Sequence, residues 1–98
     1  MKLSTIKRRA WYNEQIINYC LLNNITYVTH SSRCSDYYFI TSIDGKGKHT
    51  LKIRISNHAT TVDKDWAIPF FNCHYLKPTS TKCIYHNLEV YINKYKMR

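Results

Sequence analysis

Residues 50–56 alternate strictly between polar and apolar side chains, and this alternation constrains the fold more tightly than any other stretch of the chain. A period of two residues is the pattern of a β-strand that is buried on one face. Lys52 and Arg54 occupy polar positions, so the face of the strand that is not buried is cationic. The apolar face is formed by Leu51, Ile53 and Ile55.

A second predicted strand, residues 37–43, precedes this one across a glycine-containing turn at residues 44–48. Two such runs joined by a short turn are typical of an antiparallel hairpin. Because successive side chains point to opposite faces, a shift of the pairing by one residue exchanges the two faces of the first strand.

The length of the turn therefore decides which aromatic rings lie beside the cations. A turn of three or five residues would place Tyr38 beside Lys52 and Arg54. A turn of two or four residues would place Tyr37 and Phe39 there instead. We expect the first pairing, because Tyr37 and Phe39 then join the apolar side chains and make one face uniformly apolar.

An N-terminal helix is predicted over residues 4–23. Ser4 can cap its first turn, and Asn23 and Asn24 can end it, since asparagine tolerates the left-handed conformation that follows many helices. Apolar residues recur at helical spacing, which predicts a face that packs against the sheet. That face is expected to include Ile6, Ala10, Ile16, Ile17, Cys20 and Leu21.

The remaining elements are a strand at residues 25–30 and a second helix from Thr79 onward. The segment 67–71 is apolar but contains Pro69, so we expect a packed loop or an edge segment there. The chain of 98 residues is then a single α+β domain, residues 1–98, with an N-terminal helix, a three-stranded antiparallel sheet and a C-terminal helix. Either Ser80 or Thr81 caps the second helix, whose apolar stripe is Ile84, Leu88, Ile92 and Tyr95.

The charge of the chain points to an anionic partner. Fifteen Lys and Arg residues against six Asp and Glu residues give a formal net charge of +9. A balance this basic favours nucleic acid or an acidic protein surface. The cluster Lys7, Arg8 and Arg9 lies at the start of the predicted helix, where positive charge opposes the helix dipole. Contact with phosphate would explain it, and a solvated charged turn is the alternative.

These features predict a surface that binds the backbone of RNA or DNA, or a nucleoprotein complex. Aromatic rings beside cations are suited to stacking a base while holding its phosphate. An ordinary hairpin with a charged outer face is the alternative interpretation. Neither an RNA-recognition sheet signature nor a helix-turn-helix pattern is present. The predicted contact residues are Lys7, Arg8, Arg9, Tyr37, Tyr38, Lys46, Lys48, Lys52, Arg54 and His58.

Catalysis and metal binding have weaker support in the sequence. The carboxylates are mostly unpaired, which disfavours a two-metal nuclease. Arg54 and His58 could serve a metal-independent ribonuclease, which remains an alternative to pure binding. A zinc site would have to combine Cys-x-x-His with an adjacent Cys-His pair whose side chains diverge. We therefore expect no metal and no cofactor; the residues concerned are Cys73, His74, Cys83 and His86.

The chain shows no secretory signal and no apolar run of the roughly 18 residues that a membrane-spanning helix needs. We expect a cytoplasmic protein with no membrane partner. Its four cysteines are then expected to be reduced thiols.

Residues 31–58 resemble small uncharacterised proteins of phages and mobile elements. The resemblance rests on Ser32-x-x-Ser35-x-Tyr37-Tyr38, the Gly45 turn and a segment of the Ile-Arg-Ile-Ser-Asp-His type at residues 53–58. This chain has Asn57 where that pattern has Asp, so no carboxylate precedes His58. The resemblance implies a hairpin and a viral or mobile-element origin, hence a location in the host cytoplasm. It implies no particular activity.

Three functions are compatible with these observations. The first is a non-catalytic protein that binds nucleic acid or a nucleoprotein complex. The second is a stoichiometric inhibitor of a host defence complex, of the anti-CRISPR or anti-restriction type; its basic charge excludes mimicry of DNA. The third is a metal-independent ribonuclease toxin. We expect the first.

Overall fold

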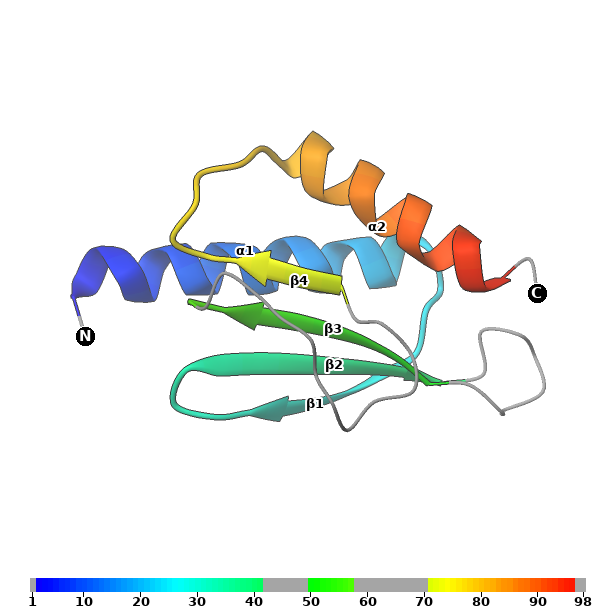
Figure 1. The fold of residues 1–98 in the computed structure, drawn as a ribbon, viewed down its shortest axis with the longest axis horizontal. Coiled ribbons are helices and arrows are strands. Elements are labelled where there is room, and N and C mark those ends of the chain that lie inside the picture. Colours follow the sequence, from blue (N-terminus) through cyan, green and yellow to red (C-terminus); the bar gives the residue numbers. More distant parts are fainter. Residues whose placement is uncertain (1, 42–49, 58–70, 97–98) are drawn as a thin grey trace.

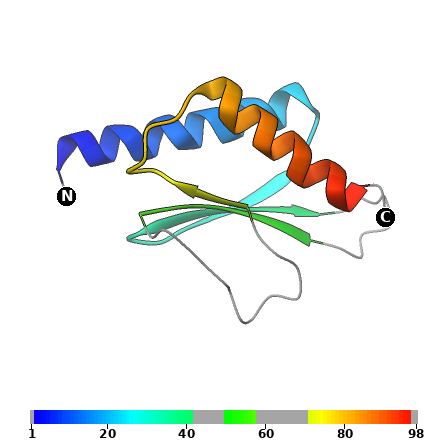
Figure 2. The same ribbon diagram turned by 45° about the horizontal axis from the view of Figure 1, so that its top comes forward.

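The alternating segment becomes the third strand of a four-stranded sheet, and both helices lie against one face of that sheet (Figure 1, Figure 2). The computed structural model describes residues 2–41, 50–57 and 71–96, except the side chains of residues 41, 50, 95 and 96. Its elements in chain order are α1 (Leu3–Leu22), β1 (Tyr27–Ser31), β2 (Ser35–Thr41), β3 (Thr50–Ser56), β4 (Phe71–His74) and α2 (Thr81–Lys96). The α+β class and the two helices are confirmed.

The sheet has one strand more than the sequence predicts. Its order is β1-β2-β3-β4, with antiparallel pairing between the first three strands and parallel pairing between β3 and β4. The prediction of three antiparallel strands is therefore wrong in detail. The predicted segment 67–71 lies outside the described residues except for Phe71, which begins this edge strand. Parallel strands are joined by a long connection and not by a short turn. The sequence next to β4 therefore contains no hairpin motif that would predict this four-residue strand.

The register of the hairpin is the opposite of the one we expected. Tyr38 pairs with Ile53, whereas Tyr37 pairs with Arg54 and Phe39 pairs with Lys52. An even number of residues, 42–49, separates the last paired residues of the two strands. Tyr37 and Phe39 therefore lie on the face with the cations, and Tyr38 lies on the apolar face.

Polar groups of α1 explain this register. The odd and even residues of β2 are similarly apolar, so hydrophobicity alone hardly distinguishes them. The even set places Asp36 and Tyr38 against α1, where Arg9 and Asn13 form hydrogen bonds with them. The sequence pattern of the hairpin contains no information about these partners.

The core lies between the sheet and the two helices. From α1 it takes Tyr12, Ile16, Tyr19 and Cys20, whereas Ile6 is 49% exposed and Leu21 is 69% exposed. The expected apolar face of α1 is thus partly wrong, because tyrosine rings replace aliphatic side chains on the buried side. Their hydroxyls can still reach polar partners, as Tyr12 does by donating to the Lys77 carbonyl. The remaining core residues include Tyr38, Ile40, Leu51, Ile53, Ile55, Cys73, Tyr75, Ile84, Leu88 and Ile92.

Two of the three predicted helix ends agree with the structure. Asn24 has a φ of 55°, the left-handed conformation predicted after α1. Ser80 caps α2, since its Oγ accepts the Cys83 N–H at 3.1 Å, and the aliphatic residues of the predicted stripe are buried. Ser4 lies inside α1, however, because the helix begins one residue earlier with Lys2 at its N-cap. Neither helix has the length and apolar composition needed to cross a bilayer.

Candidate functional site

Three aromatic side chains form a row on the sheet face that is turned away from the helices. We call His30 of β1 with Tyr37 and Phe39 of β2 the aromatic row. Strand alternation places them together, because His30 pairs directly with Tyr37 and Phe39 lies two residues further along the same strand. The ring centroids of Tyr37 and Phe39 are 6.1 Å apart with an interplanar angle of 18°, and those of His30 and Tyr37 are also 6.1 Å apart, at 34°.

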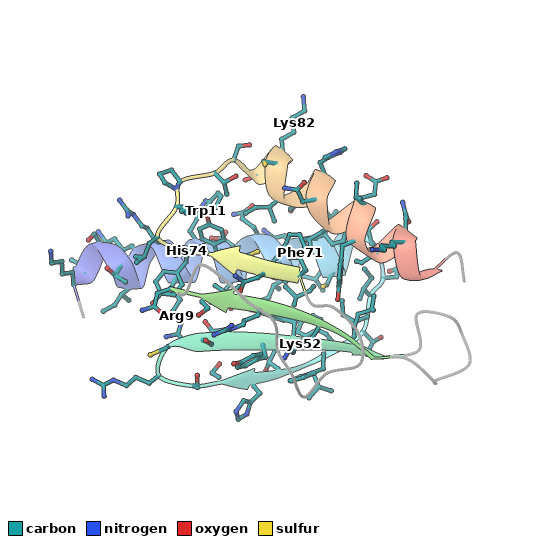
Figure 3. The ribbon with its side chains drawn as sticks, in the orientation of Figure 1. Arg9, Trp11, Lys52, Phe71, His74 and Lys82 are labelled. Carbon is teal, nitrogen blue, oxygen red and sulfur yellow. The ribbon has the colours of Figure 1, made fainter. Side chains whose placement is uncertain are left out.

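Two cationic residues of β3 flank this row. The Lys52 ammonium lies 5.4 Å from the centroid of the Tyr37 ring, within the range of a cation–π interaction. Lys52, labelled in Figure 3, is only 2% exposed, so its ammonium is buried along with its stem and its charge acts on the row from beneath the surface. Arg54 is half-buried, and its Nε lies 3.4 Å from the Ser35 Oγ. That hydroxyl donates in turn to the Ser56 Oγ at 3.1 Å, which helps to fix the guanidinium.

This arrangement can bind a planar, anionic group. Tyr37 and Phe39 are half-buried, so their rings are held in place while part of each remains accessible. Near-parallel rings present a surface on which flat groups can stack, and the adjacent cations attract negative charge. Among the predicted contact residues, the structure brings together Tyr37, Lys52 and Arg54.

Arg9, predicted to contact phosphate, is instead committed to the fold. Its guanidinium donates four hydrogen bonds: two to the carboxylate of Asp36, at 2.6 and 2.9 Å, and one each to the carbonyls of Arg33 and Ser32, at 2.7 and 2.8 Å. These bonds join α1 to the turn between β1 and β2. Asp36 therefore compensates the positive charge of Arg9, which the helix dipole at the start of α1 disfavours.

Asp36 is charged in this environment in spite of its burial. Burial raises the pKa of its carboxyl group, but hydrogen bonds from Arg9 and Asn13 outweigh that effect and hold the pKa below 3.8. The Asn13 amide donates to the Asp36 Oδ2 at 2.8 Å, and the Asn13 carbonyl oxygen accepts from the Tyr38 hydroxyl. The result is one polar network between α1 and β2.

The other predicted contact residues do not join the aromatic row. Lys7 and Arg8 are exposed on α1, on the helix side of the sheet, and the Arg8 Nη1 donates to the Leu76 carbonyl at 3.3 Å. Tyr38 is 3% exposed and belongs to the core, so it cannot stack with a ligand. The remaining predicted residues, Lys46, Lys48 and His58, lie outside the described part of the chain.

The cysteine and histidine residues singled out in the sequence are dispersed. Cys73 is buried on the helix side of β4, while His74 points to the opposite face. Cys83 and His86 are exposed on α2. Within residues 2–41, 50–57 and 71–96, no three His, Cys, Asp or Glu side chains gather in a way that could hold a metal ion.

The four free cysteines are expected to react very differently with a thiol reagent in the native state. Burial raises the pKa of Cys20 to about 11 and that of Cys73 to about 12, from an ordinary value of 9.0. The thiolate population of Cys20 at pH 8 is therefore about a hundredfold below that of an ordinary cysteine. Exposed Cys83 should be labelled first in a timed reaction followed by peptide mass mapping. Labelling of Cys20 or Cys73 as fast as Cys83 would contradict the described packing.

Sequence reasoning missed two members of the aromatic row. The expected register places Phe39 on the apolar face, and the predicted contact residues do not include His30. The alternation of residues 25–30 contained the signal for His30, because it puts this residue on one face with Val28. The partner strand and its register are also needed to place His30 beside Tyr37.

No family model, curated protein or solved structure matches this chain.

Proposed function

We propose that this protein binds single-stranded nucleic acid, RNA or DNA, without catalysis, through the aromatic row and its flanking cations. The observation that carries the proposal is the near-parallel pair Tyr37 and Phe39, with the Lys52 ammonium over one of the rings. Exposed base faces stack on such rings regardless of sequence, and nearby cations neutralise the backbone.

The shape of the site favours a single strand over a duplex. Bases in a duplex are stacked on one another and offer only their edges, so an aromatic row on a sheet has no ring face to contact. Reading a duplex in its major groove requires an inserted helix or ribbon, whereas the aromatic row lies on the face of a four-stranded sheet, on the edge strand β1 and its neighbour β2. An extended single strand can place successive bases along the row.

The charge of the protein supports an anionic partner. Arg54 is paired directly with Tyr37 across the strands and carries a guanidinium with several N–H donors. The formal net charge of +9 adds a long-range attraction that does not depend on where each cation lies. Binding should therefore weaken steeply as salt neutralises this attraction.

Tyr37→Ala is expected to weaken binding to a single-stranded oligonucleotide by roughly tenfold, because stacking contributes about 1–3 kcal/mol per base. Fluorescence anisotropy with uridine or thymidine oligonucleotides of about 12 nucleotides measures this, between about 50 and 300 mM salt. The wild-type affinity should fall linearly with salt on logarithmic axes. A duplex of equal length should bind more weakly.

Tyr85→Ala is the matched control, since it removes a half-buried tyrosine from α2, on the other side of the sheet. It should leave the affinity unchanged. Equal binding by wild type and Tyr37→Ala would refute the stacking site.

Two other outcomes would favour the alternative functions. If the protein binds no free nucleic acid but still captures a host complex from a nuclease-treated lysate, an inhibitor of that complex is favoured. Cleavage of the oligonucleotide that His58→Ala abolishes would show a ribonuclease.

A further inference from the structure

Strand β1 forms an open edge of the sheet. It is the outermost strand of the described sheet, with β2 as its neighbour, and Figure 1 shows it on the side away from β4 and α2. Every residue of β1 after Tyr27 is exposed, whereas the residues of β4, at the other edge, are buried or half-buried. Thr29 pairs with Tyr38 and so faces the helix side, yet it is exposed as well. Neither helix therefore covers this edge.

This edge lacks the features that normally prevent another strand from pairing with it. Natural edge strands are protected by lysine, by proline or by a bulge. The sequence of β1 is Tyr-Val-Thr-His-Ser, and its ladder with β2 is continuous, without a bulge. A strand without Lys or Arg is unexpected at the surface of a chain that has fifteen of them. Val28 is moreover 65% exposed, so β1 also offers apolar surface to a partner.

The ladder between β1 and β2 determines which backbone groups are available at this edge. Hydrogen-bonded pairs alternate with non-hydrogen-bonded pairs along two antiparallel strands. The Ser32 N–H donates to the Ser35 carbonyl at 2.8 Å, directly after the end of β1. Every second residue before Ser32 therefore bonds to β2. The other residues of β1 direct their N–H and C=O groups to the open edge; they are Tyr27, Thr29 and Ser31.

A second copy of β1 fits this edge when the two strands are related by a two-fold axis at Thr29. Thr29 then pairs with Thr29 of the second copy, and Tyr27 pairs with its Ser31. Each of these residues donates one backbone hydrogen bond and accepts another. Val28 lies beside His30 of the second copy in a close pair, which covers the exposed valine. No Lys or Arg side chains face each other in this pairing.

The lack of charge in β1 favours a second copy over an acidic peptide. Cations in the strand would attract an acidic peptide to this edge, and β1 has no Lys or Arg. Two copies of a chain with a formal net charge of +9 repel each other over most of their surface. They can approach closely where a surface lacks cations, and β1 provides such a surface.

We propose that β1 is a self-association site, at which two copies of the protein pair their edge strands about Thr29 and join their sheets. The dimer is a property of the protein alone, and only its consequence rests on the proposed function. The pairing aligns Val28 and Phe39 of one copy with His30 and Tyr37 of the other, on the face away from the helices. The two aromatic rows then form one continuous surface for a single strand.

Sedimentation equilibrium of the full chain without nucleic acid, from about 10 µM to about 1 mM protein, tests the proposal. Only the five residues of β1 pair, so the interface is small and we expect a dissociation constant on the order of 100 µM. About 300 mM salt should tighten the dimer relative to about 50 mM, because salt screens the repulsion between the copies. Nucleic-acid binding has the opposite salt dependence.

Thr29→Lys and Thr29→Glu test the two-fold axis. Each variant places two like charges opposite each other and should weaken the dimer at least about tenfold. An equal mixture of the two variants places opposite charges there and should associate more tightly than either variant alone. Thr29 is exposed, so both variants should keep the circular dichroism spectrum of the wild type.

Val90→Lys is the matched control, because it adds the same charge at a residue of α2 that is 56% exposed. It should leave the dissociation constant unchanged. Tyr37→Ala should also dimerise like the wild type, so failure of the nucleic-acid site is distinguishable from failure of the dimer. The proposal is overturned if the wild type stays monomeric at about 1 mM, if Thr29→Lys dimerises like the wild type, or if mixing the Thr29 variants brings no gain.

Discussion

Tyr38→Ala is expected to lower the free energy of unfolding by about 4 kcal/mol, the range of buried aromatic truncations. The Tyr38 ring is 3% exposed and packs edge to face against Tyr27, with centroids 5.3 Å apart. The substitution leaves a cavity between β2 and α1 and also removes the donor to the Asn13 carbonyl oxygen. Urea unfolding followed by circular dichroism measures the change.

Tyr37→Ala is the matched control for this prediction, because it removes the same side chain one residue away. Its ring is half-buried on the opposite face, so we expect a loss of only about 1 kcal/mol. If the turn between β2 and β3 had an odd number of residues, Tyr37 would lie in the core and Tyr38 would not, and the two stability losses would be reversed. A larger loss for Tyr37→Ala than for Tyr38→Ala would therefore contradict the described pairing of β2 and β3.

Asp36→Ala is expected to lower the free energy of unfolding by about 3 kcal/mol, because it leaves the Arg9 guanidinium without its counter-ion in a mostly buried position. The two side chains are 16% and 12% exposed. Arg9 would keep its bonds to the carbonyls of Ser32 and Arg33, which places the loss at the lower end of the range for buried pairs. Chemical denaturation at pH 7 measures it.

A double-mutant cycle separates the pair from its surroundings. Arg9→Ala and Asp36→Ala should show a coupling of about 2 kcal/mol, whereas Glu89→Ala, which removes an exposed carboxylate from α2, should change stability by less than about 0.5 kcal/mol. Additive effects of the two variants would argue against the ion pair.

The pH dependence of the same variants gives a second measurement. The pKa of Asp36 is lower in the folded protein than its ordinary value of 3.8, so the unfolded chain binds the proton first as pH falls. The contribution of Asp36 is therefore fully present above that ordinary value and is lost as pH falls through the folded pKa. The stability difference between wild type and Asp36→Ala should shrink in that acidic range.

Local patterns predicted the elements well but not their partners. The alternation of residues 50–56, the Asn24 turn and the Ser80 cap each act within a few residues, and each is found in the structure. The register of β2 depends on Arg9 and Asn13, which lie more than 20 residues away on α1. The parallel strand β4 depends on β3 in the same way.

The candidate site was predictable only in part for the same reason. The cations Lys52 and Arg54 follow from alternation within one strand, but the choice of Tyr37 over Tyr38 follows from the register. Arg9 looked available in the sequence, because the carboxylate that binds it is on another element.

The contacts that hold the N-terminal half of α1 have a consequence for synthesis of the protein. The Arg8 guanidinium donates a hydrogen bond to the carbonyl of Leu76, 68 residues further along the chain. The Tyr12 hydroxyl donates to the carbonyl of Lys77, 65 residues further along. At ribosomal rates of about 5–20 residues per second, roughly 3–14 s pass between the emergence of the two partners. During that interval the rings of Trp11 and Tyr12 lack one wall of their final environment. Chaperones that recognise exposed aromatic residues would meet α1 in this window, before the chain can close around it.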